Sequence, residues 1–117
     1  MVYGYKNLEM YKKSYGLAKR IHEMSKRLPD FERYEIGSQL RRAAMSVPMN
    51  IAEGFGKQDT SNELKRFLRM SMGSSNEIMV LLSFCNDYGY ISEQERNELE
   101  TSYEEVCKML NGYIHKH

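Results

Sequence analysis

Histidine and cysteine side chains have the most versatile chemistry in this 117-residue sequence, but their spacing matches no catalytic or metal site. His22 lies in a helical pattern, and His115 and His117 lie near the end, without a cysteine or carboxylate set to complete a metal centre. Cys85 and Cys107 form no CxxC motif, so we expect reduced, partly buried thiols. We therefore predict a protein that is not an enzyme and that uses no metal and no cofactor.

Basic side chains recur every seven residues early in the chain, which places them on two parallel ridges of one helix. One ridge comprises Lys6, Lys13, Arg20 and Arg27, and the other comprises Lys12, Lys19 and Lys26. Such ridges could follow a phosphate backbone. However, Glu9 and Glu23 lie three or four positions from several of these cations, which is also the pattern of an exposed face that pairs with itself.

A second group of cations surrounds the expected corner between the second and third helices. It comprises Arg41, Arg42, Lys57, Lys65, Arg66 and Arg69. Together with the ridges, this group supplies the candidates for binding RNA or another nucleic acid. Phe55 and Phe67 interleave with it, but Phe67 falls on a core stripe and cannot stack on a base. The sequence therefore gives little support for aromatic readout.

Charge is divided unevenly along the chain. Residues 1–70 contain 14 lysines and arginines against 8 acidic residues, whereas residues 71–117 contain 3 against 8, although the net charge is only +1. The division suits an anionic partner for the first part, self-association between unlike faces, or solubility alone.

Length and composition indicate one soluble domain spanning residues 1–117. Hydrophobic residues make up 41% and charged residues 28%, and no apolar run approaches the roughly 18 residues that a membrane span needs. The first residues lack the apolar stretch of a secretory signal. We therefore predict a cytoplasmic protein without membrane contact.

Apolar residues recur at helical spacing almost throughout, which predicts an all-α fold. We expect a first helix over about residues 5–27, and a second that begins between residues 32 and 38 and ends at residue 53. A third helix should begin at a capping box at 60–63 and end at a turn at 86–89. A fourth should begin at a capping box at 92–95. Gly54 and Gly56 are interpreted as the stop of the second helix, because no strand or Lys-Ser/Thr pair makes them a phosphate-binding loop. Short links predict an antiparallel, up-down four-helix bundle with crossing angles of about 20°.

Each expected helix carries an apolar stripe that should face the core. In the first helix the stripe comprises Leu8, Tyr11, Tyr15, Ala18, Ile21 and His22. In the second it comprises Ile36, Leu40, Ala43, Val47 and Ile51. In the third it comprises Leu64, Phe67, Leu68, Ser71, Ser75, Ile78, Leu82 and Cys85. In the fourth it comprises Leu99, Tyr103, Val106, Leu110 and Tyr113.

Pro48 stands in the middle of the second helix, where proline costs about 3 kcal/mol because it lacks an N–H and crowds the preceding turn. Val47 and Ile51 keep the phase of the core stripe, so we expect the helix to continue with a kink. Its opposite side is also apolar and comprises Met45, Pro48, Met49 and Ala52. We favour this side as the contact surface of an oligomer over a methionine-rich surface tolerated by a tight turn.

Small and polar residues could accommodate the bend at Pro48. Gly73 and Ser74 on the third helix would let another backbone approach closely. Hydrogen bonds around the kink could come from Asn50, Glu53, Asn76 and Glu77. We therefore expect these side chains to lie near the proline.

Several segments together resemble a known family. They are Leu-Pro at 28–29, Glu-Arg-Tyr at 32–34, SQLRRAAMSVPMNIAEGFG at 38–56, ELKRFLRMSMGSSNE at 63–77, GYIS at 89–92 and KMLNGYI at 108–114. Nearly the whole chain is similar to the four-helix-bundle proteins called 23S rRNA intervening-sequence proteins. The structural signature assigned on this basis comprises Gln39, Asn50, Glu53, Gly54, Gly73, Ser74 and Glu77. Met49 stands where a small polar residue is common, and Tyr11 stands where a tryptophan is expected.

The resemblance implies self-association. A relative, the accessory variability protein of diversity-generating retroelements, resembles this bundle, forms a barrel-like homopentamer, and binds nucleic acid and a reverse transcriptase. We therefore expect a homopentamer, with structured RNA or an RNA-handling enzyme as candidate partners. That relative is strongly basic, whereas the net charge here is +1. The alternative is a protein–protein adaptor whose acidic fourth helix, at residues 93–105, meets a basic partner without binding nucleic acid.

Overall fold

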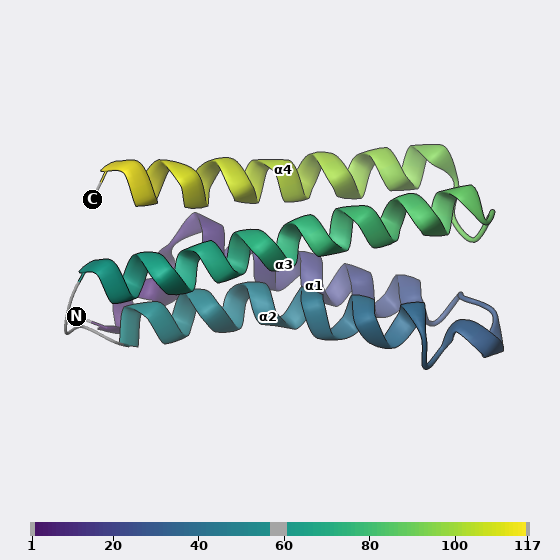
Figure 1. Ribbon diagram of the computed structural model, residues 1–117, viewed down its shortest axis with the longest axis horizontal. Helices are drawn as coiled ribbons and strands as arrows, with labels where there is room; N and C mark the ends of the chain where they lie inside the picture. The colour runs from purple at the N-terminus through teal and green to yellow at the C-terminus, as the bar shows by residue number, and fades with distance from the viewer. Residues whose placement is uncertain (1, 57–60, 117) are drawn as a thin grey trace.

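The computed structural model describes residues 2–56 and 61–116, which form an all-α fold (Figure 1). The elements are the 3-10 helix η1 (Val2–Asn7), α1 (Glu9–Ser25), the 3-10 helix η2 (Asp30–Glu32), α2 (Ile36–Gly56), α3 (Ser61–Asp87) and α4 (Glu93–Lys116). These described residues contain four long helices and no strand, so the predicted fold class is confirmed. The boundaries of a single domain stay a prediction.

The four long helices lie along the 44 Å axis of a molecule that measures 23 × 20 Å across (Figure 1). α2 contacts α1 and α3, and α4 packs against α3 and, less extensively, against α1. Contacts made late in α2 fall early in α3: Gly54 lies beside Leu64, whereas Ser46 contacts Ser74. α2 and α3 therefore run antiparallel to each other.

The core consists largely of the stripes predicted on α2, α3 and α4, whereas of the stripe predicted on α1 only Ile21 is fully buried. Fully buried large side chains include Leu40, Ile51, Leu68, Ile78, Leu82, Leu99, Tyr103 and Leu110. The apolar residues that α1 buries are Met10, Leu17, Ile21 and Met24. Tyr15, by contrast, is 51% exposed, and His22 is exposed. The prediction was therefore right for Ile21 and wrong for Tyr15 and His22, because α1 carries two neighbouring apolar stripes and the predicted one lies mostly beside α2 at the surface.

Gly54 does not end α2, contrary to the prediction, because the helix continues to Gly56. Gly54 is buried, and a Cβ atom built on it would lie 3.0 Å from Leu64 Cδ1 and from Phe67 Cβ. The missing side chain therefore lets α2 and α3 approach closely, and this contact is the physical reason for a glycine here. Residues 57–60 lie outside the described residues.

The turn between α3 and α4 matches its prediction. Gly89 adopts the left-handed conformation, with φ +80°, and ends α3. Ser92 Oγ accepts a hydrogen bond from Glu95 N–H at 3.1 Å, which forms one half of the predicted capping box. The Glu95 side chain does not complete the box but pairs with Arg27. The other predicted capping box begins at Thr60, outside the described residues.

α2 continues through Pro48 as one helix, as predicted, while the kink stays a prediction. Side chains hydrogen-bond the backbone on either side of the proline: Ser46 Oγ donates to Ala43 O at 2.9 Å, Asn50 Nδ2 to Ser46 O at 2.8 Å, and Ser71 Oγ to Val47 O at 2.8 Å. Asn50 thus takes the place expected of it near Pro48. Asn76 and Glu77 are instead exposed on α3.

Candidate functional site

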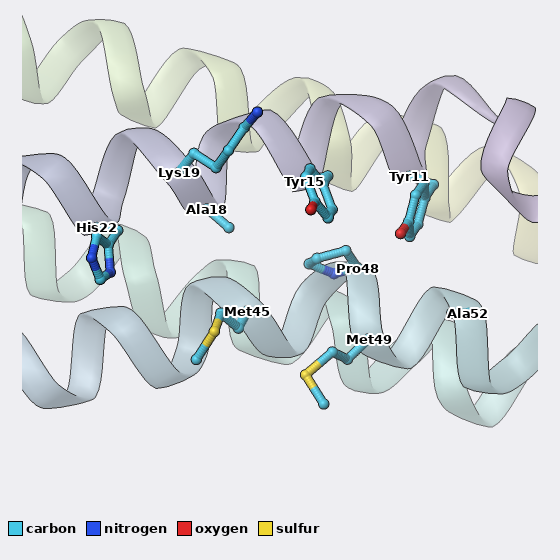
Figure 2. A pocket seen from close by; sticks show the side chains of 9 residues that line it. All are labelled: Tyr11, Tyr15, Ala18, Lys19, His22, Met45, Pro48, Met49 and Ala52. Carbon is cyan, nitrogen blue, oxygen red and sulfur yellow. The ribbon is translucent and has the colours of Figure 1, made fainter.

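An apolar groove runs between α1 and α2 (Figure 2). Its cavity of about 350 Å³ is lined from α1 by Tyr11, Tyr15, Ala18, Lys19 and His22, and from α2 by Met45, Pro48, Met49 and Ala52. We call this the α1–α2 groove. The stripe of α1 that the sequence assigned to the core thus meets the apolar outer side of α2.

Two methionines of the groove stand on either side of a buried proline. Met45 is 54% exposed and Met49 is 65% exposed, whereas Pro48 is buried. In Figure 2 the Pro48 ring points toward α1, while the Met49 thioether points away from it. The structure therefore brings together Met45, Pro48, Met49 and Ala52, the residues predicted to form an oligomer contact. That they touch another chain stays a prediction.

Three tyrosines form a row that leads from η1 along α1 into the groove. The rings of Tyr5 and Tyr11 lie 5.0 Å apart edge to face, and those of Tyr11 and Tyr15 lie 5.8 Å apart. Burial and the neighbouring phenols of Tyr5 and Tyr15 raise the pKa of Tyr11. The Lys19 ammonium lies 5.4 Å from the centre of the Tyr15 ring. Aromatic and thioether walls with a cationic rim are typical of a protein-binding surface.

Short contacts fix α2 against α3. Ser46 Oγ and Ser74 Oγ lie 2.5 Å apart, so Ser74 provides the close approach that was predicted for it. Gly73 does not, because a Cβ atom built on this exposed glycine would meet nothing within 4 Å. The other exposed members of the predicted signature are Gln39, Glu53 and Glu77.

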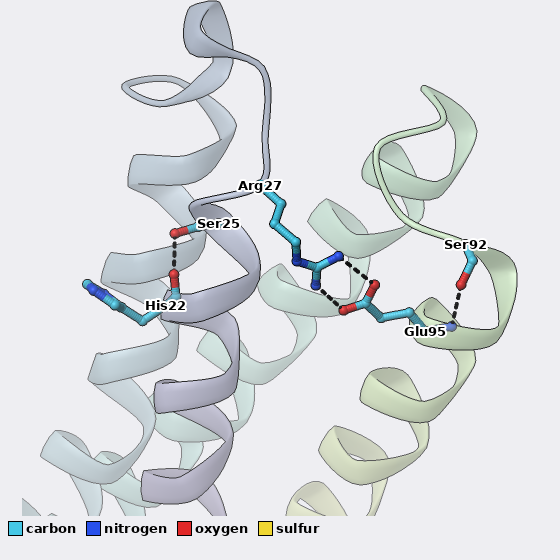
Figure 3. Close-up of polar contacts among 5 residues, drawn as sticks. All are labelled: His22, Ser25, Arg27, Ser92 and Glu95. Atoms are coloured by element: carbon cyan, nitrogen blue, oxygen red, sulfur yellow. Dashed lines mark hydrogen bonds and ion pairs between the residues drawn. The ribbon is translucent and has the colours of Figure 1, made fainter.

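Many of the cations predicted to bind nucleic acid are paired with carboxylates. The pairs are Lys12 with Glu9, Lys13 with Glu105, Lys26 with Glu23, Arg27 with Glu95, and Arg66 with Glu63. The pairs of Lys12 and Lys26 agree with the interpretation of α1 as a self-paired face. Lys13 and Arg27 instead reach carboxylates of α4, as Figure 3 shows for Arg27. These contacts neutralise much of both ridges.

Arg41 lies away from the corner between α2 and α3 that the second basic group was expected to surround. Arg41 donates hydrogen bonds to Ser25 Oγ at 3.2 Å and to Arg33 O at 3.0 Å. At a helical rise of about 1.5 Å per residue, Arg41 lies about 20 Å along α2 from Gly54, so it is far from the start of α3. Among the described residues no carboxylate pairs with Lys19, Arg20, Arg42, Lys65 or Arg69. Lys57 lies outside the described residues.

No metal centre is found in residues 2–56 and 61–116, where no three His, Cys, Asp or Glu side chains are grouped to hold an ion. The cysteines are free, as predicted, and Cys85 is buried. Burial, with a smaller contribution from the charge of Glu32, raises the pKa of the Cys85 thiol to about 11. In the same described ranges, no helix combines the length and the apolar character that crossing a membrane requires.

Four long helices and an open apolar groove define a small all-α protein whose candidate site is a surface. The chain belongs to the 23S rRNA-intervening sequence protein family, whose sequence profile matches residues 6–112. The family indicated by the sequence is therefore confirmed.

A similar solved structure comes from Bacteroides thetaiotaomicron VPI-5482 and is described as a protein with unknown function from the S23 ribosomal protein family. The two chains are 23% identical with a TM-score of 0.83, over 90% of this chain and 97% of that one. At this identity the likeness shows the fold alone. A search of curated proteins found no match.

Proposed function

We propose that this protein is a non-enzymatic subunit of a cytoplasmic homo-oligomer, which assembles through the α1–α2 groove and acts as a scaffold. The observation that carries the proposal is the exposure of Met45 and Met49 on either side of buried Pro48, beside the tyrosines of α1. Flexible apolar side chains adapt well to a partner surface. Burying them against another chain stabilises the assembly by about 25 cal/mol per Å² of apolar area, whereas in a monomer this area stays in contact with water.

We propose five subunits, the number that the family resemblance implies. A closed ring forms when two different faces of the chain meet. The groove belongs to residues 1–70, which carry an excess of cations, whereas residues 71–117 carry an excess of carboxylates. This division of charge supports a contact between unlike faces.

Light scattering during size-exclusion chromatography tests the assembly. The expected mass is about five times that of one chain, and it should fall as the protein is diluted. A mass of one chain at micromolar concentration would contradict the assembly. Another multiple would contradict only the subunit number.

Binding of structured RNA is a second candidate function. It is supported by Lys19 and Arg20, neighbours on α1 for which no carboxylate partner is found among the described residues. Gel shifts with 23S rRNA fragments should show binding that falls steeply between about 50 and 200 mM salt. The double substitution Lys19→Glu with Arg20→Glu should weaken it. The absence of any shift at low salt would reject this function.

The alternative to RNA binding is an adaptor that holds a basic protein, such as an RNA-handling enzyme. It is supported by the exposed carboxylates of α4, which include Glu93, Glu98 and Glu104. A partner captured from cell extract should resist nuclease and be lost when these carboxylates are neutralised. Capture that disappears after nuclease treatment would contradict the adaptor function.

A further inference from the structure

Aromatic side chains form a row at one end of the bundle, separate from the α1–α2 groove. The rings of Phe84 and Tyr88 lie 5.9 Å apart, and those of Tyr88 and Tyr90 lie 5.7 Å apart. Tyr90 Oη donates a hydrogen bond to Glu32 Oε2 at 2.7 Å. This bond ties the turn after α3 to η2, and both segments lie at the same end in Figure 1.

Four large aromatic side chains on or next to these two segments are open to solvent. They are Phe31 at 72% exposure, Tyr34 at 78%, Phe84 at 46% and Tyr88 at 58%. We call these four residues the aromatic end. Phe31 and Tyr34 lie on either side of Glu32 in sequence, so the Tyr90 hydrogen bond anchors the segment that presents them.

Carboxylates dominate the charge around the aromatic end. Residues 30–35 and 84–94 contain Asp30, Glu32, Glu35, Asp87 and Glu93 against Arg33. Two cations near these stretches have partners within the chain: Arg27 pairs with Glu95, and Arg41 donates to Arg33 O and Ser25 Oγ. Aromatic faces and carboxylates both attract cations, whereas this excess of negative charge repels phosphate. The surface therefore suits a cationic partner and disfavours RNA.

We propose that the aromatic end binds a lysine- or arginine-rich segment of a partner protein. Cationic side chains would stack on the rings of Phe84 and Tyr88 while Asp87 accepts hydrogen bonds from them. The Tyr90 hydrogen bond to Glu32 holds the two segments together before binding, which reduces the ordering that association requires. The inference rests on the adaptor function proposed above and names its docking surface, whereas assembly through the groove is independent of it.

Fluorescence anisotropy with a labelled peptide of Arg-Gly repeats tests the surface, with a Gln-Gly peptide as the uncharged counterpart. The full-length protein should bind the Arg-Gly peptide and not the Gln-Gly peptide. Tyr88→Ala should weaken binding about fivefold, because it removes an exposed ring without changing charge. The double substitution Glu35→Gln with Asp87→Asn should weaken binding and flatten its salt dependence.

Tyr15→Ala is the matched control, since Tyr15 is 51% exposed and belongs to the groove. It should bind the peptide as the wild type does, and circular dichroism should show unchanged helicity in every variant. Equal binding by wild type and Tyr88→Ala, or equal weakening by Tyr15→Ala, would overturn the proposal.

Two further measurements separate the possible occupants of the aromatic end. A loss of oligomer mass in Tyr88→Ala would assign this surface to a second copy of the chain, and a loss of the RNA shift would assign it to nucleic acid; either result would overturn the proposal. The protein could bind the peptide through Tyr88 and yet capture no nuclease-resistant partner from cell extract. That pair of results would support the docking surface and contradict only the proposed adaptor function.

Discussion

Arg27, which follows α1, and Glu95, in the first turn of α4, form a two-point ion pair between helices far apart in sequence. Arg27 Nη1 donates to Glu95 Oε1 at 3.2 Å, and Nη2 donates to Oε2 (Figure 3). The hydrogen bonds with Glu95 raise the pKa of Arg27. The Glu95 N–H donates to Ser92 Oγ, which caps α4, so the residue that receives the cap also joins α4 to the end of α1.

A double-mutant cycle of Arg27→Gln and Glu95→Gln should give a coupling free energy of about 0.5–1 kcal/mol, since the pair is well aligned but partly exposed. The matched control is Lys26→Gln with Glu23→Gln, a more exposed pair within one stretch of chain, which should couple less. Urea denaturation measures both. Equal coupling in the two cycles would show that the two-point geometry adds nothing.

Acidification should remove the contribution of the pair between Lys13 and Glu105. The hydrogen bond from Lys13 lowers the pKa of Glu105 from its usual 4.5. Since the folded-state pKa is the lower one, the pair stabilises the fold above pH 4.5, and this effect is lost as pH falls through the folded-state pKa. Glu105→Gln should therefore have a lower urea midpoint than the wild type near neutral pH, and the difference between the two midpoints should shrink in acid. Glu104→Gln is the control. A difference in midpoint between Glu105→Gln and the wild type that does not change with pH would contradict the pH-dependent contribution of this pair.

Gly54→Ala and Gly73→Ala form a matched test of how closely α2 and α3 pack. Alanine gains about 1 kcal/mol over glycine inside a helix, so Gly73→Ala, whose new methyl meets nothing within 4 Å, should stabilise the fold. At Gly54 the methyl would press on Phe67 Cβ at 3.0 Å and on Leu64 O at 3.3 Å, so we expect a net loss of about 1–3 kcal/mol. Thermal unfolding measures both. Stabilisation by both substitutions would mean that α3 moves aside easily.

Met49→Asp should dissociate the oligomer and leave helicity intact, because a carboxylate buried without a partner is costly whereas the same side chain is harmless in water. Met70→Asp is the control, since Met70 is 44% exposed on α3 and does not line the groove. Light scattering gives the mass and circular dichroism the helicity. An unchanged mass in Met49→Asp would remove the groove from the interface.

Helical periodicity predicted the number of long helices and most of the core, because the stripes chosen on α2, α3 and α4 are the ones that pack inward. Leu68, Ile78 and Leu82 recur at helical spacing and are fully buried. The Gly89 cap and the Ser92 hydrogen bond are also local features, set by residues a few positions apart. Such features depend little on the rest of the fold.

The groove could not be predicted from local sequence patterns, because it depends on how the helices are rotated and placed relative to one another. Met10, Leu17 and Met24 also recur at helical spacing, so either stripe of α1 could have faced inward until its rotation was known. The partners of Lys13 and Arg27 depend on α4 lying beside α1. Gly54 was misread because glycine both ends helices and permits close approach, and only the position of α3 distinguishes the two.

The contacts between helices differ in extent, and this difference implies an order in which the helices separate during unfolding. α2 and α3 share the most extensive contact, which includes the hydrogen bond from Ser71 Oγ to Val47 O and the close approach at Gly54. Of the neighbouring long helices that pack together, α1 and α4 share the least extensive contact, and two partly exposed ion pairs join them. Local unfolding starts where buried contact is smallest. Separation of α1 from α4 therefore precedes loss of the α2 and α3 pair, whose amides should exchange with solvent last.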